Sequence, residues 1–257
     1  MNSTKSSYTG FIPYPASVFR SLLTYLIRSG EVLPGSTFLD LGAGEGGLVM
    51  EAVDLGLHGF GIEIHPRLVR EGKIRTENER IRFSRNTRCE LAEGSYYPPE
   101  YIELRDQGRA VALDYEDGIF WRQHPDGTTL FQHFYPTERR ELFHPVVSEP
   151  NPFRVLGIGL QDIDLFFSYT WGIQLPSILE LFSLYARGGS VLLNVTSTFP
   201  ERHEELVKRL NLTIEDIGSA QAREDHTGDC QKYRKDMREA GFEPTKALSY
   251  RISYHMR

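Results

Sequence analysis

Short, continuous apolar runs alternate along this chain with longer segments in which apolar residues recur every three or four positions. The first pattern is typical of buried strands and the second of amphipathic helices. The runs predict strands at residues 38–41, 59–64, 89–93, 164–169 and 190–195. The helical spacing predicts helices at residues 14–27, 45–55, 66–80, 176–186, 201–210 and 222–240, and residues 246–256 alternate like a terminal strand.

The order of these elements predicts the fold class. Strands that alternate with helices form parallel sheets covered on both faces, so we expect an α/β protein with a Rossmann-like, doubly wound sheet. Ligands of such sheets bind at the carboxyl ends of the strands, near the point where the strand order reverses. Candidate binding residues are therefore sought at the strand ends.

The alternation breaks between residues 98 and 159, where aromatic residues and turn signals dominate. Asp117-Gly118 and Asp126-Gly127 separate short runs at 110–115, 119–123 and 128–134, and Asp-Gly in such a position is a hairpin signal. We expect a small β-meander at residues 98–159, inserted into a main domain formed by residues 1–97 and 160–257. This insertion is interpreted as a lid over an acceptor pocket or as a homodimer contact.

A glycine turn follows the first predicted strand. Gly42, Gly44 and Gly47 fit the dinucleotide fingerprint G-x-G-x-x-G, in which glycines let the backbone turn sharply and approach a ligand closely. Glu63 lies 21 positions after Gly42, at the end of the second strand, where a carboxylate can bind both ribose hydroxyls. These residues alone fit a nicotinamide cofactor equally well.

Asp40, two residues before Gly42, separates the two cofactor classes. A carboxylate at this strand end would repel the pyrophosphate of a nicotinamide dinucleotide, because like charges repel at short range. The same carboxylate suits S-adenosylmethionine, which carries an ammonium and a sulfonium but no phosphate. The sequence therefore favours S-adenosylmethionine, with a nicotinamide site as the alternative.

The run Asp40-Leu41-Gly42-Ala43-Gly44-Glu45-Gly46, together with the acid in Gly-Ile-Glu-Ile, resembles class I S-adenosylmethionine-dependent methyltransferases over residues 8–97 and 160–257. The resemblance implies a seven-stranded sheet and S-adenosylmethionine as cofactor. It implies cofactor contacts from the glycine turn and the strand ends, namely Asp40, Gly42, Ala43, Gly44, Gly46, Glu63, Ile64, Glu93, Gly94, Ser95, Phe167 and Ser168. A looser resemblance to seven-stranded protein-lysine methyltransferases adds Tyr8 and Phe11, in the segment before the first helix.

In this family the acceptor meets the methyl group at the end of the fourth strand, which makes Ser168, Tyr169 and Trp171 the catalytic candidates. Tyr169 would orient or deprotonate an acceptor, or else pack as a core aromatic residue. The Asp/Asn-Pro-Pro-Tyr/Phe signature of enzymes that methylate base amino groups is missing after this strand. We expect transfer to N or O of a small molecule, with a protein-lysine acceptor or a non-catalytic cofactor-binding subunit as alternatives.

The composition of the chain limits the kinds of molecule that we expect it to bind. The 257 residues carry a net charge of -6, without the general basic bias of a nucleic-acid binder, and no apolar segment approaches the length of a membrane span. Residues 67–88 are locally basic and are interpreted as a solvated helix face, with a patch for phosphate or an acidic partner as the alternative. Cytoplasmic localisation is expected because the two cysteines form no disulfide framework. No metal site is expected, since the histidines at 124, 133 and 144 lie near turns.

Overall fold

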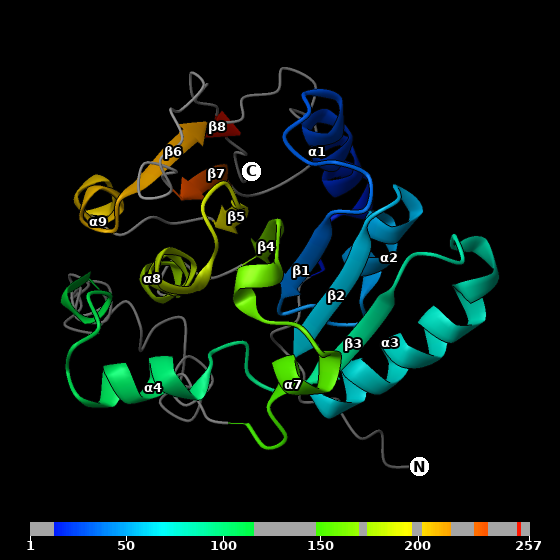
Figure 1. Ribbon diagram of the computed structural model, residues 1–257, viewed down its shortest axis with the longest axis horizontal. Helices are drawn as coiled ribbons and strands as arrows, with labels where there is room; N and C mark the ends of the chain where they lie inside the picture. The colour runs from blue at the N-terminus through cyan, green and yellow to red at the C-terminus, as the bar shows by residue number, and fades with distance from the viewer. Residues whose placement is uncertain are drawn as a thin grey trace, which may run out of the picture.

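Parallel strands with buried side chains on both faces form the centre of the sheet (Figure 1). The computed structural model describes residues 13–115, 148–169, 174–196, 202–216, 229–235 and 251–252. The strands are β1 Thr37–Leu41, β2 His58–Glu63, β3 Cys89–Glu93, β4 Leu165–Tyr169, β5 Val191–Thr196, β6 Leu212–Asp216, β7 Asp229–Lys235 and β8 Arg251–Ile252. They are ordered β3-β2-β1-β4-β5-β7-β6, with β8 on β7, and only the first five are parallel.

Helices cover both faces of this sheet because neighbouring strand residues point to opposite sides. Phe38 belongs to a core with α1 Ala16–Arg28, α2 Gly47–Asp54 and α3 Pro66–Glu79. Leu39 belongs to a second core with α4 Pro99–Asp106, α7 Pro152–Leu156, α8 Leu175–Tyr185 and α9 His203–Arg209. Short 3-10 turns, η1 Arg80–Arg82 and η3 Leu160–Asp162, lead into β3 and β4. Within the described ranges, no helix combines the length and apolar character needed to cross a bilayer.

The Rossmann-like class and the first five predicted strands are confirmed, and so are the helices predicted at 14–27, 45–55, 66–80, 176–186 and 201–210. Periodicity succeeded here because each of these elements buries a continuous run or a single stripe of apolar residues. The β8 strand lies within the alternating segment at 246–256.

Two expectations are wrong, and a third is not confirmed. The helix predicted at 222–240 gives way to β7, which hydrogen-bonds to β5 on one side and β6 on the other, so sheet pairing overrides local helical spacing. Among the described residues the sheet has eight strands, the short β8 included, so the expected seven is not confirmed. Residues 110–115 form turns and a short helical segment instead of the first strand of a meander.

The rest of the expected meander, with the runs at 119–123 and 128–134, lies outside the described residues, so the inserted subdomain stays a prediction. The described segments on either side of it, α4 and α7, are helical. Pro99 occupies the first turn of α4, and Asn151 caps α7 by accepting hydrogen bonds from the backbone of Phe153 and Arg154. Proline in the first helical turn and asparagine at the cap are start signals for helices, which explains why both segments are helical.

Leu91 of β3 packs into a hole bounded by three glycines from different elements. A Cβ atom on Gly46, Gly61 or Gly72 would lie 2.8, 2.6 or 2.5 Å from a Leu91 methyl carbon. At Gly61 that atom would also lie 2.5 Å from the Cβ of Ala43 in the glycine turn. The turn, β2 and α3 therefore close onto β3 only because these positions lack side chains.

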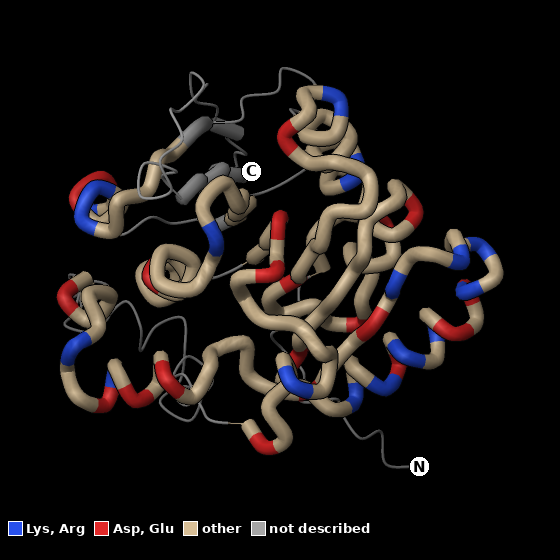
Figure 2. The backbone as a smooth tube through the Cα atoms, in the orientation of Figure 1, with Lys and Arg blue, Asp and Glu red and all other residues tan. Residues whose placement is uncertain are grey.

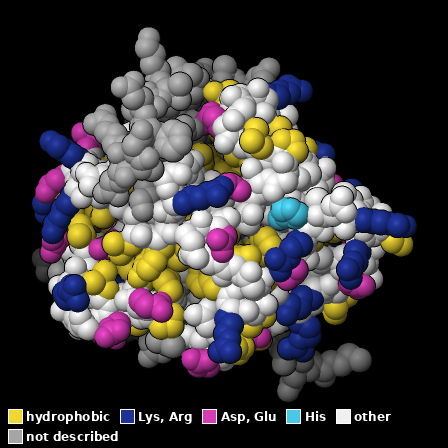
Figure 3. Space-filling model, viewed as in Figure 1, with side chains coloured by type: hydrophobic (Ala, Val, Ile, Leu, Met, Phe, Trp, Pro, Cys, Tyr) yellow, Lys and Arg dark blue, Asp and Glu magenta, His cyan; other side chains and the backbone are white. Residues whose placement is uncertain are grey.

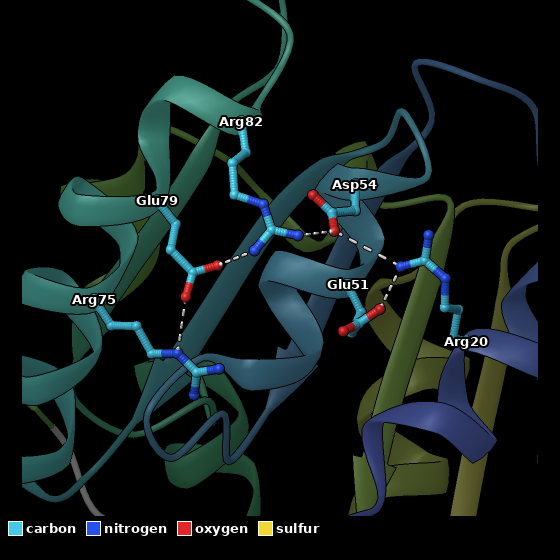
Figure 4. Close-up of polar contacts among 6 residues, drawn as sticks. All are labelled: Arg20, Glu51, Asp54, Arg75, Glu79 and Arg82. Atoms are coloured by element: carbon cyan, nitrogen blue, oxygen red, sulfur yellow. Dashed lines mark hydrogen bonds and ion pairs between the residues drawn. The ribbon is translucent and has the colours of Figure 1, made fainter.

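A chain of ion pairs joins the outer helices on the α1–α2–α3 face (Figure 4). It runs from α1 across α2 to η1 and α3, with contacts of 2.6 to 3.7 Å, through Arg20, Glu51, Asp54, Arg82, Glu79 and Arg75. Exposed pairs of this kind each contribute about 0–1 kcal/mol to stability. These ion pairs therefore link the three helices but contribute little to the stability of the fold.

We predict that Gly61→Ala destabilises the protein by about 1–3 kcal/mol, because the added methyl group overpacks the contact between β2, Ala43 and Leu91. Urea unfolding would measure the change. Gly47→Ala is the matched control, since nothing lies within 4 Å of a Cβ there and the residue begins α2. Equal stabilities of the two variants would show that the close approach at Gly61 is not required.

Candidate functional site

The polar residues predicted at the strand ends lie along one edge of the sheet. Glu63 ends β2 and is paired in register with Glu93, which ends β3. On the other side, Asp40 of β1 is paired with Phe167 of β4, and Leu41 with Ser168. The carboxyl ends of the four strands thus bring these residues to the edge where ligands of doubly wound sheets bind.

The glycine turn is tied to β2 by backbone hydrogen bonds. The N–H groups of Gly42 and Ala43 both donate to the carbonyl of Ile62, at 2.9 and 3.0 Å. Gly42, Gly44 and Gly46 adopt φ angles of 93°, 54° and 74°, a left-handed conformation that residues with side chains rarely adopt. Gly42 is exposed, with open space where a Cβ would lie, so a ligand can approach its backbone.

Glu63 connects the turn to the second strand. Its side chain is buried, and Oε2 accepts a hydrogen bond from Gly44 N–H at 2.9 Å while Oε1 accepts one from His65 N–H at 2.9 Å. A carboxylate oxygen can accept two hydrogen bonds, so each oxygen retains capacity for a ligand hydroxyl. The two backbone amides therefore fix the carboxylate in place without using up its acceptors.

Asp40 lies beneath the turn and is only 3% exposed. Burial, with a smaller contribution from the nearby charge of Glu63, raises the pKa of Asp40 to about 8. No hydrogen bond or basic side chain among the described residues offsets these effects. The site therefore has a buried acid whose ionised form lacks a partner, which suits a cationic ligand.

The segment after β3 adds residues to the same edge. Glu93 is exposed, whereas Ser95 is buried with its Oγ accepting Tyr97 N–H at 3.2 Å and its N–H donating to Ser148 Oγ at 2.7 Å. Gly94 N–H donates to the carbonyl of Glu63 at 3.0 Å, which holds this segment against β2. Of the three predicted contacts after β3, Glu93 is the one whose side chain is available to a ligand.

Tyr96 also belongs to this edge, although no sequence pattern identified it. Burial raises the pKa of its hydroxyl to about 12, with a further contribution from the charge of Glu63, so the ring lies near that acid. Its ring is 4.6 Å from that of Tyr97. Its position three residues after Glu93 is the only signal that could have found it.

The end of β4 is more enclosed than expected. Ser168 is fully buried, and its Oγ has no hydrogen-bond partner within the described chain. Tyr169 is half-buried against Tyr14, with ring centroids 5.4 Å apart, and Tyr14 also contacts Phe167 at 5.3 Å. The chain just before α1 therefore reaches the end of β4. Burial raises the pKa of Tyr169, so its hydroxyl is a hydrogen-bond donor at neutral pH and not a ready base.

The remaining candidates divide into two groups. Gly46 is the N-cap residue of α2 and packs on Leu91, which gives it a structural role, while Ile64 is 44% exposed beside Glu63. Trp171, Tyr8 and Phe11 lie outside the described residues, as do the histidines at 124, 133 and 144. Within the described chain, no cluster of three or more histidine, cysteine or acidic residues could hold a metal ion.

Comparison with known proteins gave matches among solved structures alone, because no family model and no curated protein matches the chain. Magnesium protoporphyrin IX methyltransferase from Synechocystis PCC 6803, with bound cofactor, has a TM-score of 0.49 and 10% identity over 86% of this chain and 79% of that one. Precorrin-6y C5,15-methyltransferase from Geobacter metallireducens GS-15 has a TM-score of 0.46 and 14% identity, over 90% of this chain and 93% of that one. An RNA methyltransferase from Salinibacter ruber, in complex with S-adenosylhomocysteine, has a TM-score of 0.41 and 15% identity, over 93% of this chain and 99% of that one.

With identities below 25% and TM-scores below 0.5, these likenesses identify neither a cofactor nor an acceptor for this chain. The fold itself follows from the sheet, which places the glycine turn between the first parallel strand and α2, beside the reversal of strand order between β1 and β4. This is the Rossmann-like, doubly wound arrangement that the order of the predicted elements implies.

We predict that the free energy of unfolding falls as pH rises from about 5 to 8.5, and that Asp40→Asn removes much of this fall. The folded-state pKa of Asp40 is about 8 against 3.8 for an ordinary aspartate. A group whose pKa is higher in the folded than in the unfolded state contributes its full stabilisation at pH values below its unfolded-state pKa. This contribution is lost as the pH rises through its folded-state pKa. The difference should be on the order of a few kcal/mol in urea unfolding.

Asp106→Asn, at an exposed position at the end of α4, is the matched control and should leave the pH dependence of the wild type unchanged. Parallel pH curves for wild type and Asp40→Asn would contradict a buried, protonated Asp40.

Proposed function

We propose that this chain is an S-adenosylmethionine-dependent methyltransferase that transfers a methyl group to N or O of a small-molecule acceptor. The observation that carries this proposal is Asp40, buried below the glycine turn without a cationic partner in the described chain. The fold and the position of the turn support it, since the site lies at the carboxyl edge of the sheet.

The charges at the turn favour this cofactor over a nicotinamide dinucleotide. A pyrophosphate placed on the turn would lie near both Asp40 and Glu63. No arginine or lysine among the described residues lowers the pKa of Asp40, so no nearby cation would offset the repulsion. Repulsion between like charges in a partly buried site is strong. An ammonium or sulfonium would instead stabilise the ionised Asp40, so binding and ionisation of this acid would favour each other.

Each part of the cofactor has a candidate partner. Asp40 would hold the aminoacyl end, directly or through water, while Glu63 would accept hydrogen bonds from the ribose hydroxyls. Glu93 is the exposed acid that would reach the adenine amino group. The exposed backbone of Gly42 leaves room for the ligand to lie across the turn. These residues account for a cationic nucleoside without requiring a phosphate site.

When bound, this cofactor would supply an electrophilic methyl group on a sulfonium. The acceptor N or O would take that methyl group, sulfur would keep the electron pair of the carbon–sulfur bond, and any acceptor proton would go to water or a base. The chain's contribution is alignment and exclusion of water. Tyr169 keeps its proton at neutral pH and would donate a hydrogen bond that orients the acceptor. Tyr14 packs against it and fixes its ring.

Calorimetry with S-adenosylhomocysteine should show binding to the wild type, and Asp40→Asn and Glu63→Gln should each weaken it by about tenfold or more, since each variant removes a charge-assisted hydrogen bond. NAD should not bind measurably. Glu90→Gln is the matched control because Glu90 lies near the amino end of β3, away from the carboxyl edge of the sheet, and pairs with Arg88. Binding of NAD in preference to S-adenosylhomocysteine would overturn the proposal.

A protein-lysine acceptor is the second enzymatic candidate, supported by the position of Tyr14, because the segment before the first helix reaches the end of β4. Incubation of a lysate with methyl-labelled cofactor separates the two. The small-molecule proposal predicts label in low-mass products, whereas label in a protein band would assign a protein acceptor. Cofactor binding with no label transfer to either fraction would indicate a non-catalytic partner subunit.

A further inference from the structure

A groove with a volume of about 1050 Å³ lies between α3 and the amino end of β3. Its walls include Lys73, Arg80, Ile81, Arg85 and, from α7, Val155. Cys89, the first residue of β3, lines the groove, whereas Glu93 ends the same strand at the candidate cofactor site. Four residues of a strand span about 13 Å, so the groove begins well away from Glu93, although its lining extends along β3 as far as Leu91.

This surface is basic in a chain that is acidic overall. Residues 67–88 contain eight lysine and arginine residues against three glutamates, although the whole chain has a net charge of -6. Figure 2 shows these cationic residues along α3 and the segment that follows it. Figure 3 shows their side chains on one edge of the molecule, interspersed with acidic ones. A local excess of positive charge attracts an anionic partner and orients its approach.

The cations that line the groove differ in how far they are already engaged. Arg88 donates from Nε to Glu90 at 2.8 Å and from Nη2 to the carbonyl of Leu156 at 2.7 Å, so it supports the wall. Arg80 is 3.4 Å from Glu77, and both side chains are more than 70% exposed. Lys73 and Arg85 are exposed and form no ion pair or hydrogen bond with any residue that the structure describes. These two are the charges available to a ligand.

Aliphatic side chains lie beside these charges. Ile81 is 96% exposed and Val155 is 51% exposed, and both line the groove. Phe83 is the one aromatic residue among the lining residues, and it is partly buried. Single-stranded nucleic acids are bound by exposed aromatic rings on which bases stack, a feature this surface lacks. Exposed aliphatic groups between free cations instead fit a peptide that alternates acidic and aliphatic residues.

We propose that this groove binds an acidic segment of a protein partner. Lys73 and Arg85 contact carboxylates of the segment, and Ile81 and Val155 contact an aliphatic side chain between them. This proposal does not depend on which cofactor the glycine turn binds, because none of these four contact residues is a candidate for binding the cofactor.

Fluorescence anisotropy would test it with a labelled peptide of three Glu-Asp-Leu repeats and the full chain. We expect binding that weakens with salt, and a loss of at least fivefold in affinity for the double variant Lys73→Glu, Arg85→Glu. Ile81→Ala should weaken binding severalfold with no change of charge, and the high exposure of Ile81 makes a folding defect from this variant unexpected. Arg70→Glu is the matched control, because Arg70 is an exposed cation of α3 that does not line the groove.

Three results would overturn the proposal: no binding of the peptide at moderate salt, an equal loss in Arg70→Glu, or tighter binding of a deoxythymidine oligonucleotide than of the peptide. The second would show a diffuse charge effect, and the third would assign the surface to nucleic acid. Thermal melting checks that each variant is folded. Affinity for S-adenosylhomocysteine, measured on the same samples, should not change, so failure here is distinguishable from failure of the cofactor assignment.

Discussion

The close contact of the glycine turn with β2 and β3 is the constraint on which the site depends. The carbonyl of Ile62 accepts hydrogen bonds from the first two amides of the turn, and Leu91 fills the space that glycines leave below it. This contact positions the backbone of Gly44 to donate to the Glu63 carboxylate. A methyl group on Gly61 would push the turn away from β2 and would disturb that hydrogen bond. Packing in the core and the geometry of the ligand edge therefore share one cause.

The buried Asp40 is costly to the fold when ionised, and this cost indicates function. Desolvation raises its pKa to about 8, and no described side chain compensates its charge. An apolar residue of similar size would stabilise the folded protein more. Two acids at adjacent strand ends would repel a phosphate, whereas a cation bound between them would relieve both the desolvation and the mutual repulsion. Binding of a cation there would therefore recover part of the free energy that ionisation of Asp40 costs the fold.

Sequence patterns predicted those features that depend on local chemistry. The apolar runs located β1 to β5. Asp40, Gly42 and Glu63 lie together at the carboxyl edge of the sheet because each follows from its position at a strand end, while their roles toward a cofactor stay predictions. The patterns failed where pairing partners distant in the chain decide the structure, as for β7 between β5 and β6. They also missed Tyr96, whose pKa is raised in part by the charge of Glu63, because the tertiary fold brings it within electrostatic range of that acid. The acceptor side could not be predicted because methyl transfer demands no fixed set of catalytic residues.

A crystal structure of the protein with S-adenosylhomocysteine tests the central claim most directly. The account predicts the ligand across the glycine turn, with its ribose hydroxyls on Glu63 and its ammonium near Asp40, directly or through one water. A nucleoside bound away from this turn, or an ammonium paired with another acid while Asp40 stays buried and unliganded, would contradict it.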